Sequence, residues 1–161
     1  MNAELRIGLG FDAHRLAAGR PLMLGGVDLG FERGLAGHSD GDALLHALSD
    51  ALLGSLGLPD IGTLFPDDDP NYKGADSARL LTEVLERVRA AGGRPVNVDV
   101  VVVCDRPKLQ PHVPAIRTRL AGLLGLAPDA VGIKAKTTEG TAIADRESIA
   151  VMATVLVRVA S

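Results

Sequence analysis

The most strongly patterned segment, residues 41–57, predicts a helix that is buried on nearly all sides. Its apolar residues are Ala43, Leu44, Leu45, Ala47, Leu48, Ala51, Leu52, Leu53 and Leu56. A helix with apolar residues all round is typical of a protein core. Its polar residues lie three or four apart, and therefore on one face, and are Asp42, His46, Ser49 and Asp50. Because a buried carboxylate or imidazole without a partner is costly, we expect this polar stripe to face a functional site.

The rest of the pattern predicts one sheet and two more helices. Alternating or continuous apolar runs indicate strands at 5–14, 96–103, 131–140 and 149–159, and a hairpin at 20–34. Apolar positions at helical spacing indicate a second helix that starts at Asp76 or Ser77 and ends before Gly92. The same spacing indicates a third helix over 111–124.

The last strand, 149–159, is apolar on both faces, so both faces need cover. One layer of helices covers only one face of a sheet, and we therefore expect a subunit interface on the other. The sequence predicts a single α+β domain over residues 1–161. In this two-layer arrangement helices cover one face of a mixed sheet, and the other face packs against other subunits.

Composition narrows the function. The chain has 161 residues, enough for one full core, and only 2% of them are aromatic. Nucleic-acid modules that stack bases need aromatic platforms, and a net charge of -3 gives no basic field for nucleic acid or anionic lipid. The single cysteine, Cys104, excludes a disulfide framework and favours a reducing compartment. With no signal pattern and no membrane-length apolar run, we expect a soluble cytoplasmic protein.

Candidate chemistry begins on the first strand. Asp12 and His14 are two residues apart, so they share a face of that strand. Together with His46 on the buried helix they would supply three metal ligands, the number that catalytic zinc sites use while keeping a fourth position open. The alternative is that Asp12 and His14 form a surface pair at the end of a strand.

Three loops carry further candidates. Ahead of the buried helix, His38 and Ser39 either donate to a phosphate at the helix N-terminus or only shape the loop, and Asp40 or Asp42 caps the helix. The acidic loop 63–74 is a long exposed segment, either functional or a solvated turn. After the strand at 131–140, the tip holding Thr137, Thr138 and Glu139 is either an ordinary turn or a grip for phosphate and Mg²⁺.

In order along the chain, the motifs resemble those of the 2-C-methyl-D-erythritol 2,4-cyclodiphosphate synthase family of the non-mevalonate isoprenoid pathway. The resemblance covers nearly the whole chain. The matching residues are Gly8-x-Gly10-Phe11-Asp12-x-His14, Gly25-Gly26-Val27, His38-Ser39-Asp40-Gly41-Asp42 with His46, Asp60-Ile61-Gly62, Leu64-Phe65-Pro66-Asp67-x-Asp69-Pro70, Lys73-Gly74-Ala75-Asp76-Ser77, Asn97-Val98-Asp99, Pro107-Lys108 and Lys134-Ala135-x-Thr137-Thr138-Glu139.

The resemblance implies a set of site residues. Asp12, His14 and His46 would bind Zn²⁺ or another divalent metal, and Glu139 would bind Mg²⁺ or Mn²⁺ with the substrate diphosphate. His38 and Thr137 would take part in catalysis beside these ligands. His38 and Ser39 would lie near the phosphates, and Lys136, Thr137 and Thr138 would hold the CDP diphosphate. The residues implied to hold the methylerythritol phosphate are Asp60, Ile61, Gly62, Phe65, Pro66, Asp67, Asp68 and Asp69. Those implied to contact cytosine are Cys104, Asp105, Arg106, Pro107, Lys108, Leu109 and Gln110, and Glu139, Ile143 and Arg146 are also implied to bind the substrate.

The resemblance also implies a reaction and an assembly. The 2-phosphate of 4-diphosphocytidyl-2-C-methyl-D-erythritol 2-phosphate would attack the β-phosphorus of the same molecule, CMP would leave, and a cyclic diphosphate would form. Two anionic groups must approach, so cations and alignment would supply the catalysis, and no general base is needed. The active sites would lie between subunits of a homotrimer, which agrees with the two-faced last strand.

One stretch departs from the family. Residues 140–148 are shorter by about one residue than the family's glycine-rich run and lack its Phe. Arg146 and Glu147 stand near the positions of the family's Arg and Glu. Two other functions stay open from the residues alone: a metallohydrolase that uses zinc-bound water, and a non-catalytic metal- or nucleotide-binding protein on the same fold.

Overall fold

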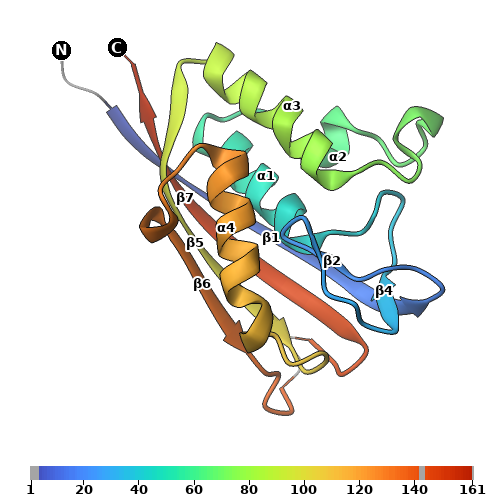
Figure 1. Cartoon of the computed structure of the whole chain (residues 1–161). Coiled ribbons are helices and arrows are strands. Elements are labelled where there is room, and N and C mark those ends of the chain that lie inside the picture. The colour runs from blue at the N-terminus through green and yellow to red at the C-terminus, as the bar shows by residue number, and fades with distance from the viewer. Residues whose placement is uncertain (1–3, 142–143, 161) are drawn as a thin grey trace.

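The structure, a computed structural model that describes residues 4–141 and 144–160, is a mixed sheet covered by helices on one face (Figure 1). The strands follow the order β4-β1-β7-β5-β6. Their bounds are Glu4–Ala18 for β1, Arg33–Leu35 for β4, Gly93–Cys104 for β5, Val131–Lys136 for β6 and Ser148–Val159 for β7. Only β5 and β6 pair in parallel; the other neighbours are antiparallel. The α+β class and the two-layer arrangement predicted from the sequence are confirmed.

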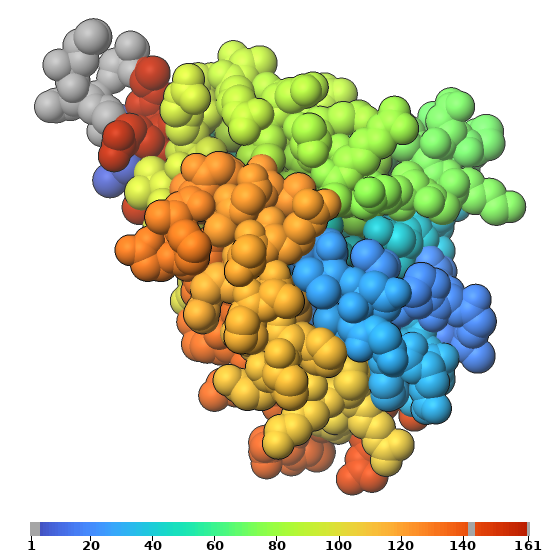
Figure 2. Space-filling model, viewed as in Figure 1, coloured from blue at the N-terminus to red at the C-terminus, as the bar shows by residue number. Residues whose placement is uncertain are grey.

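Three long helices form the second layer, with α1 at Ala43–Ser55, α3 at Ser77–Ala90 and α4 at Val113–Leu124. Helix α1 packs on β1 and β7, α4 packs on β6, and α3 lies beside α1. From the helical side, α3, α4 and the hairpin of β2 (Met23–Leu24) and β3 (Val27–Asp28) cover most of α1 (Figure 2). Within the described residues, no helix is long and apolar enough to cross a membrane.

Helix α1 lies unusually close to strand β1, because two glycines of β1 face it. A Cβ built on Gly8 would lie 1.8 Å from the carbonyl oxygen of Ala51, and one on Gly10 would lie 1.8 Å from that of Ala47. Any side chain at these two positions would therefore force the backbone of α1 away from the backbone of β1. The close approach brings the next residues of β1 on the same face within reach of side chains on α1.

Asp42 corrects one sequence expectation. It was placed in the polar stripe that faces the site, but its side chain is fully buried and points to the hairpin. Its carboxylate accepts hydrogen bonds from the N–H groups of Gly25 at 2.9 Å, Gly26 at 2.7 Å and Leu45 at 3.0 Å. Burial raises the pKa of Asp42, while these three N–H groups act in the opposite direction. Of the two predicted caps, Asp40 and Asp42, Asp42 is therefore the residue that caps α1, and it also attaches the hairpin turn to the helix.

Several element boundaries also differ from the predictions. Helix α1 spans 13 residues rather than 41–57, because Asp42 caps it and the chain turns at Leu56. The third helix begins at Val113, after a short 3-10 helix, Gln110–His112. Segment 63–74, predicted as a long exposed loop, is partly ordered by α2 (Ile61–Leu64) and a 3-10 helix (Pro70–Tyr72). Its Phe65 is 6% exposed and packs edge-on against Tyr72.

The other face of the sheet carries large apolar side chains that the chain itself leaves uncovered. They are Leu5, Ile7, Leu9, Phe11 and Met152, with exposed fractions of 56%, 75%, 72%, 56% and 40%. These side chains come from the adjacent strands β1 and β7. A contiguous exposed apolar surface of this kind marks an interaction site. A subunit interface here stays a prediction.

Replacing Gly10 with Ala is expected to destabilise the fold, because the new methyl group would overlap the Ala47 carbonyl of α1. We expect the free energy of unfolding to fall by about 2 kcal/mol or more. Gly54→Ala on the same helix is the matched control, since a Cβ there meets nothing within 4 Å. That variant should be neutral or gain up to about 1 kcal/mol. Denaturation at one fixed protein concentration measures both, and equal stabilities would contradict the close approach.

Candidate metal centre and active site

Strand β1 and helix α1 bring Asp12, His14 and His46 together, as the sequence predicted. Asp12 and His14 lie on the face of β1 that carries Gly8 and Gly10, and His46 faces them from the first turn of α1. The Oδ2 atom of Asp12 is 2.7 Å from His14 Nε2 and 3.0 Å from His46 Nδ1. One candidate ligand atom from each residue lies within 4.8 Å of the others. The three residues therefore form a cluster rather than a surface pair.

The electrostatics of the cluster favour an ionised carboxylate. Burial alone would raise the pKa of Asp12, but hydrogen bonds from His14 and His46 outweigh it and hold this pKa at about 2. Asp12 therefore accepts rather than donates at any ordinary pH. The hydrogen bond to Asp12 in turn raises the pKa of His14, against the opposing effect of burial.

This donor set fits a divalent metal ion. Two imidazole nitrogens and one carboxylate oxygen converge on one point, the combination that catalytic zinc sites use. Each imidazole also has a second partner that fixes its ring, as metal-bound histidines usually do. For His14 this partner is the backbone of Ala36, and for His46 it is the hydroxyl of Ser77, 2.9 Å from Nε2.

A cavity of about 220 Å³ opens beside the cluster. Its lining includes Asp12, His14, Gly37, His38, Ser39, His46, Ile61, Gly62, Phe65, Asp67, Tyr72 and Leu80. The predicted substrate residues His38, Ser39, Ile61, Gly62, Phe65 and Asp67 are thus brought together with the three candidate metal ligands. The imidazole of His38 and the hydroxyl of Ser39 lie in this lining beside the cluster, and hydrogen-bond donors of this kind suit an anionic group such as a phosphate.

The neighbouring predicted residues shape this cavity. Asp60 caps α2, accepting from Thr63 N at 2.8 Å, and Asp50 accepts from Ile61 N at 2.9 Å. Asp69 caps the following 3-10 helix, and its carbonyl oxygen lies 3.3 Å from His38 Nε2. Pro66 and Asp68 belong to the same turn.

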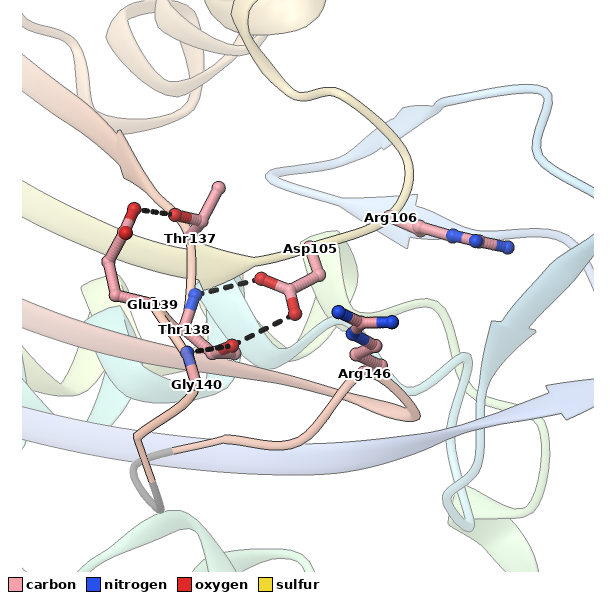
Figure 3. A pocket seen from close by; sticks show the side chains of 7 residues that line it. All are labelled: Asp105, Arg106, Thr137, Thr138, Glu139, Gly140 and Arg146. Atoms are coloured by element: carbon pink, nitrogen blue, oxygen red, sulfur yellow. Dashed lines mark hydrogen bonds between the residues drawn. The ribbon is translucent and has the colours of Figure 1, made fainter.

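A second cavity, of about 510 Å³, lies at the tip after β6 (Figure 3). Its lining includes Asp105, Arg106, Thr137, Thr138, Glu139, Gly140 and Arg146. The carboxylate of Asp105 accepts from Thr138 twice, from N at 2.8 Å and from Oγ1 at 2.9 Å. These two bonds hold the pKa of Asp105 below its usual range. The Thr137 hydroxyl donates to Glu139, so Thr137 and Glu139 present oxygen atoms side by side.

The turn after β5 borders this region on its other side. A cavity of about 400 Å³ there is lined by Cys104, Asp105, Lys108, Leu109, Gln110, Ala135, Lys136 and Thr137. The peptide bond between Arg106 and Pro107 in this turn is cis. Burial raises the pKa of the Cys104 thiol to about 11, so this cysteine is a packed neutral group rather than a nucleophile. Ile143, also predicted to bind substrate, lies outside the described residues.

The predicted site residues thus fall into two groups within one chain. His14 on β1 pairs with Ile149 on β7, and Ile149 pairs with Cys104 on β5, so both groups sit at the same end of the sheet. Three strand spacings separate β1 from β6, which amounts to about 14 Å. Among the described residues, the linings of the first and second cavities have none in common.

Comparison with known proteins identifies the chain's relatives. The model of the YgbB family matches residues 5–158. The chain belongs to the YgbB family. A relative from Salinibacter ruber, named 2-C-methyl-D-erythritol 2,4-cyclodiphosphate synthase, is 56% identical over 143 residues, 89% of this chain and 91% of the relative. One of the same name from Alkalilimnicola ehrlichii is 54% identical over 155 residues, 95% and 94% of the two chains.

Solved structures give the same result. One of a 2C-methyl-D-erythritol-2,4-cyclodiphosphate synthase in a CDP-bound form superposes with a TM-score of 0.88. It is 45% identical and covers 94% of this chain and 99% of its own. The family resemblance inferred from the motifs is therefore confirmed, and so is the expected fold.

Sequence reasoning missed three residues of this YgbB-family site. Ser77 was considered only as a helix cap, yet its hydroxyl contacts His46. Tyr72 and Leu80 complete the wall of the cavity beside the metal cluster. The motif from Lys73 to Ser77 was the available signal for Ser77, because its match extended beyond what a helix cap requires.

His46→Ala is expected to weaken divalent metal binding, because it removes one of three converging ligand atoms. The loss should exceed the roughly 10- to 100-fold typical of changes to outer-shell partners. Zinc content after gel filtration, measured by mass spectrometry of the metal, tests this. His112→Ala is the control, since His112 lies in the 3-10 helix before α4 and should leave zinc content unchanged. Equal zinc content in the His46 variant and the unaltered chain would contradict the ligand assignment.

Proposed function

We propose that the chain converts 4-diphosphocytidyl-2-C-methyl-D-erythritol 2-phosphate into 2-C-methyl-D-erythritol 2,4-cyclodiphosphate with release of CMP, as a phosphorus–oxygen lyase. The observation that carries the proposal is the similarity to relatives that bear the name of this synthase, which are 56% and 54% identical over 89% and 95% of this chain. The cluster of Asp12, His14 and His46 agrees with it.

Two divalent ions would be held by different parts of the chain. Asp12, His14 and His46 would hold Zn²⁺, and Glu139, with its oxygen atoms beside those of Thr137, would hold Mg²⁺ or Mn²⁺. Bound cations supply positive charge and Lewis acidity that offset the repulsion between the reacting phosphates. The choice of ions follows from the donor atoms, since imidazole suits zinc and oxygen ligands suit magnesium.

The two groups of site residues match the two ends of this substrate. The cavity beside the metal cluster would take the methylerythritol phosphate, with Asp60, Gly62 and segment 65–69 around its hydroxyl groups. The turn at 104–110 would take cytosine, largely through its backbone. Lys136, Thr137 and Thr138 would bind the diphosphate that joins the two halves, and Arg146 lies close enough to the tip to add positive charge.

The chain's own residues would position groups rather than transfer protons. The attacking phosphate oxygen is already ionised at neutral pH, so the reaction requires no general base. His38 Nε2 now contacts the Asp69 carbonyl oxygen and the Thr137 hydroxyl now donates to Glu139; exchanging these contacts would let both groups donate hydrogen bonds to phosphate oxygens. Alignment of the attacking oxygen with the leaving CMP would then supply much of the rate.

A homotrimer would unite the two half-sites. Within one chain the metal cluster and the Thr137 tip are about three strand spacings apart and face separate cavities. The uncovered apolar face of β1 and β7 offers a surface for a second copy. In this arrangement the metal cluster of one subunit and the 104–110 and 136–139 segments of its neighbour would form one active site.

The function is tested by incubating the purified chain with the proposed substrate, Mg²⁺ and Zn²⁺. We expect CMP and the cyclic diphosphate to form in equal amounts, and phosphorus NMR measures both products. Release of CDP or inorganic phosphate would instead indicate a hydrolase, and binding of CDP without turnover would indicate a binding protein. Either result would contradict the proposal.

The assembly is tested by placing a charge on the open face of the sheet. Leu9→Glu should shift the chain from trimer to monomer and reduce turnover by at least about 100-fold, since half of each site would be missing. Light scattering after gel filtration measures the mass. Ala115→Glu is the control, because Ala115 is exposed on the helical side, in the first turn of α4. A monomeric Leu9 variant with full activity would show that one chain holds a complete site.

A further inference from the structure

The proposed metal ligand His46 is the end of a hydrogen-bonded chain that begins at Asp40. Its Nε2 atom is 2.9 Å from the hydroxyl of Ser77, and that hydroxyl donates to the carboxylate of Asp40. The backbone N–H of Ser77 donates to the other oxygen of Asp40 at 3.1 Å. Ser77 is the first residue of α3 and is 1% exposed, so the residue in the middle of this series of contacts is shielded from water.

The direction of these bonds fixes the proton on the imidazole. A carboxylate can only accept, so the single proton of the Ser77 hydroxyl is taken by Asp40. The Ser77 oxygen therefore offers a lone pair to His46, and Nε2 of His46 must carry the proton that bridges them. Ser39 Oγ, 3.1 Å from the same nitrogen, receives a hydrogen bond from Gly41 N and can share the Nε2 proton.

His14 does not need a carboxylate behind its second partner. Its partner beyond the cluster is the backbone of Ala36, and a carbonyl oxygen can only accept. A serine hydroxyl can donate or accept, so Ser77 alone would permit either tautomer of His46. Asp40 removes that freedom.

We propose that Asp40 and Ser77 are positioning residues that keep a proton on Nε2 of His46, so that Nδ1, which lies 3.0 Å from the Asp12 carboxylate, is the nitrogen that binds the metal. This inference rests on the metal site proposed above. It explains why a carboxylate outside the ligand set lies one hydroxyl away from a ligand, and why the start of α3 packs on the loop before α1. Asp40 also accepts from Asp42 N at 3.1 Å, so the same carboxylate orders that loop.

The protonated nitrogen is identified on the zinc-loaded chain, because without the ion Nδ1 donates to Asp12 Oδ2, 3.0 Å away. Long-range proton–nitrogen correlation spectra of histidine-labelled chain should show His46 protonated at Nε2 and bound to zinc through Nδ1. His46→Gln identifies the resonance. Zinc bound through Nε2, with the proton on Nδ1, would overturn the proposal, and the measurement needs no variant that could fail to fold.

Zinc affinity supplies the second test. Ser77→Ala and Asp40→Asn are expected to raise the dissociation constant for Zn²⁺ by about 10- to 100-fold, measured by competition with a chromogenic chelator. Ser55→Ala is the matched control, since Ser55 is a buried serine of α1 whose hydroxyl donates to Leu52 O. An unchanged zinc affinity in both Ser77→Ala and Asp40→Asn would overturn the proposal. Failure of the unaltered chain to bind zinc would instead contradict the metal site itself, so the two failures are distinguishable.

Discussion

The close contact between β1 and α1 positions the candidate metal ligands, on which the proposed function depends. Gly8 and Gly10 allow the carbonyl oxygens of Ala51 and Ala47 to lie where side chains would otherwise be. The strand then continues, on the same face, into Asp12 and His14, and the helix presents His46 opposite them. Ligand atoms from a strand and a helix converge only because the two backbones pack this closely. The cluster of Asp12, His14 and His46 is therefore a product of backbone packing.

A second constraint places the loop that enters α1. Asp42 accepts three backbone N–H bonds inside the core and attaches the hairpin turn to the helix. Two residues earlier, Asp40 accepts from the start of α3. Two aspartates thus fasten the same loop to two different elements, and His38 and Ser39 lie on the stretch between β4 and these anchors. Rigid support of this kind is what a site for charged ligands requires.

Much of this could be predicted from the sequence, and the limits have physical causes. The proximity of the three residues could be predicted, because Asp12 and His14 share a strand face and His46 lies on an apolar helix, and periodicity is a local property. The direction of Asp42 could not be predicted, because its partners at Gly25 and Gly26 lie in another element. The order within segment 63–74 depends on Phe65 meeting Tyr72, a packing contact that composition does not show. The separation of the two cavities follows from strand order, which no single strand's pattern specifies.

The two faces of strand β1 have different roles. Asp12 points to the metal cluster, and its neighbour Phe11 belongs to the apolar face that the chain leaves open. In a newly made chain, the large apolar side chains on this face of β1 and β7 are consequently exposed to water until another surface covers them. Such surfaces promote aggregation at high concentration. Rapid association with copies of itself would then protect the solubility of this protein during synthesis, in addition to any role in catalysis.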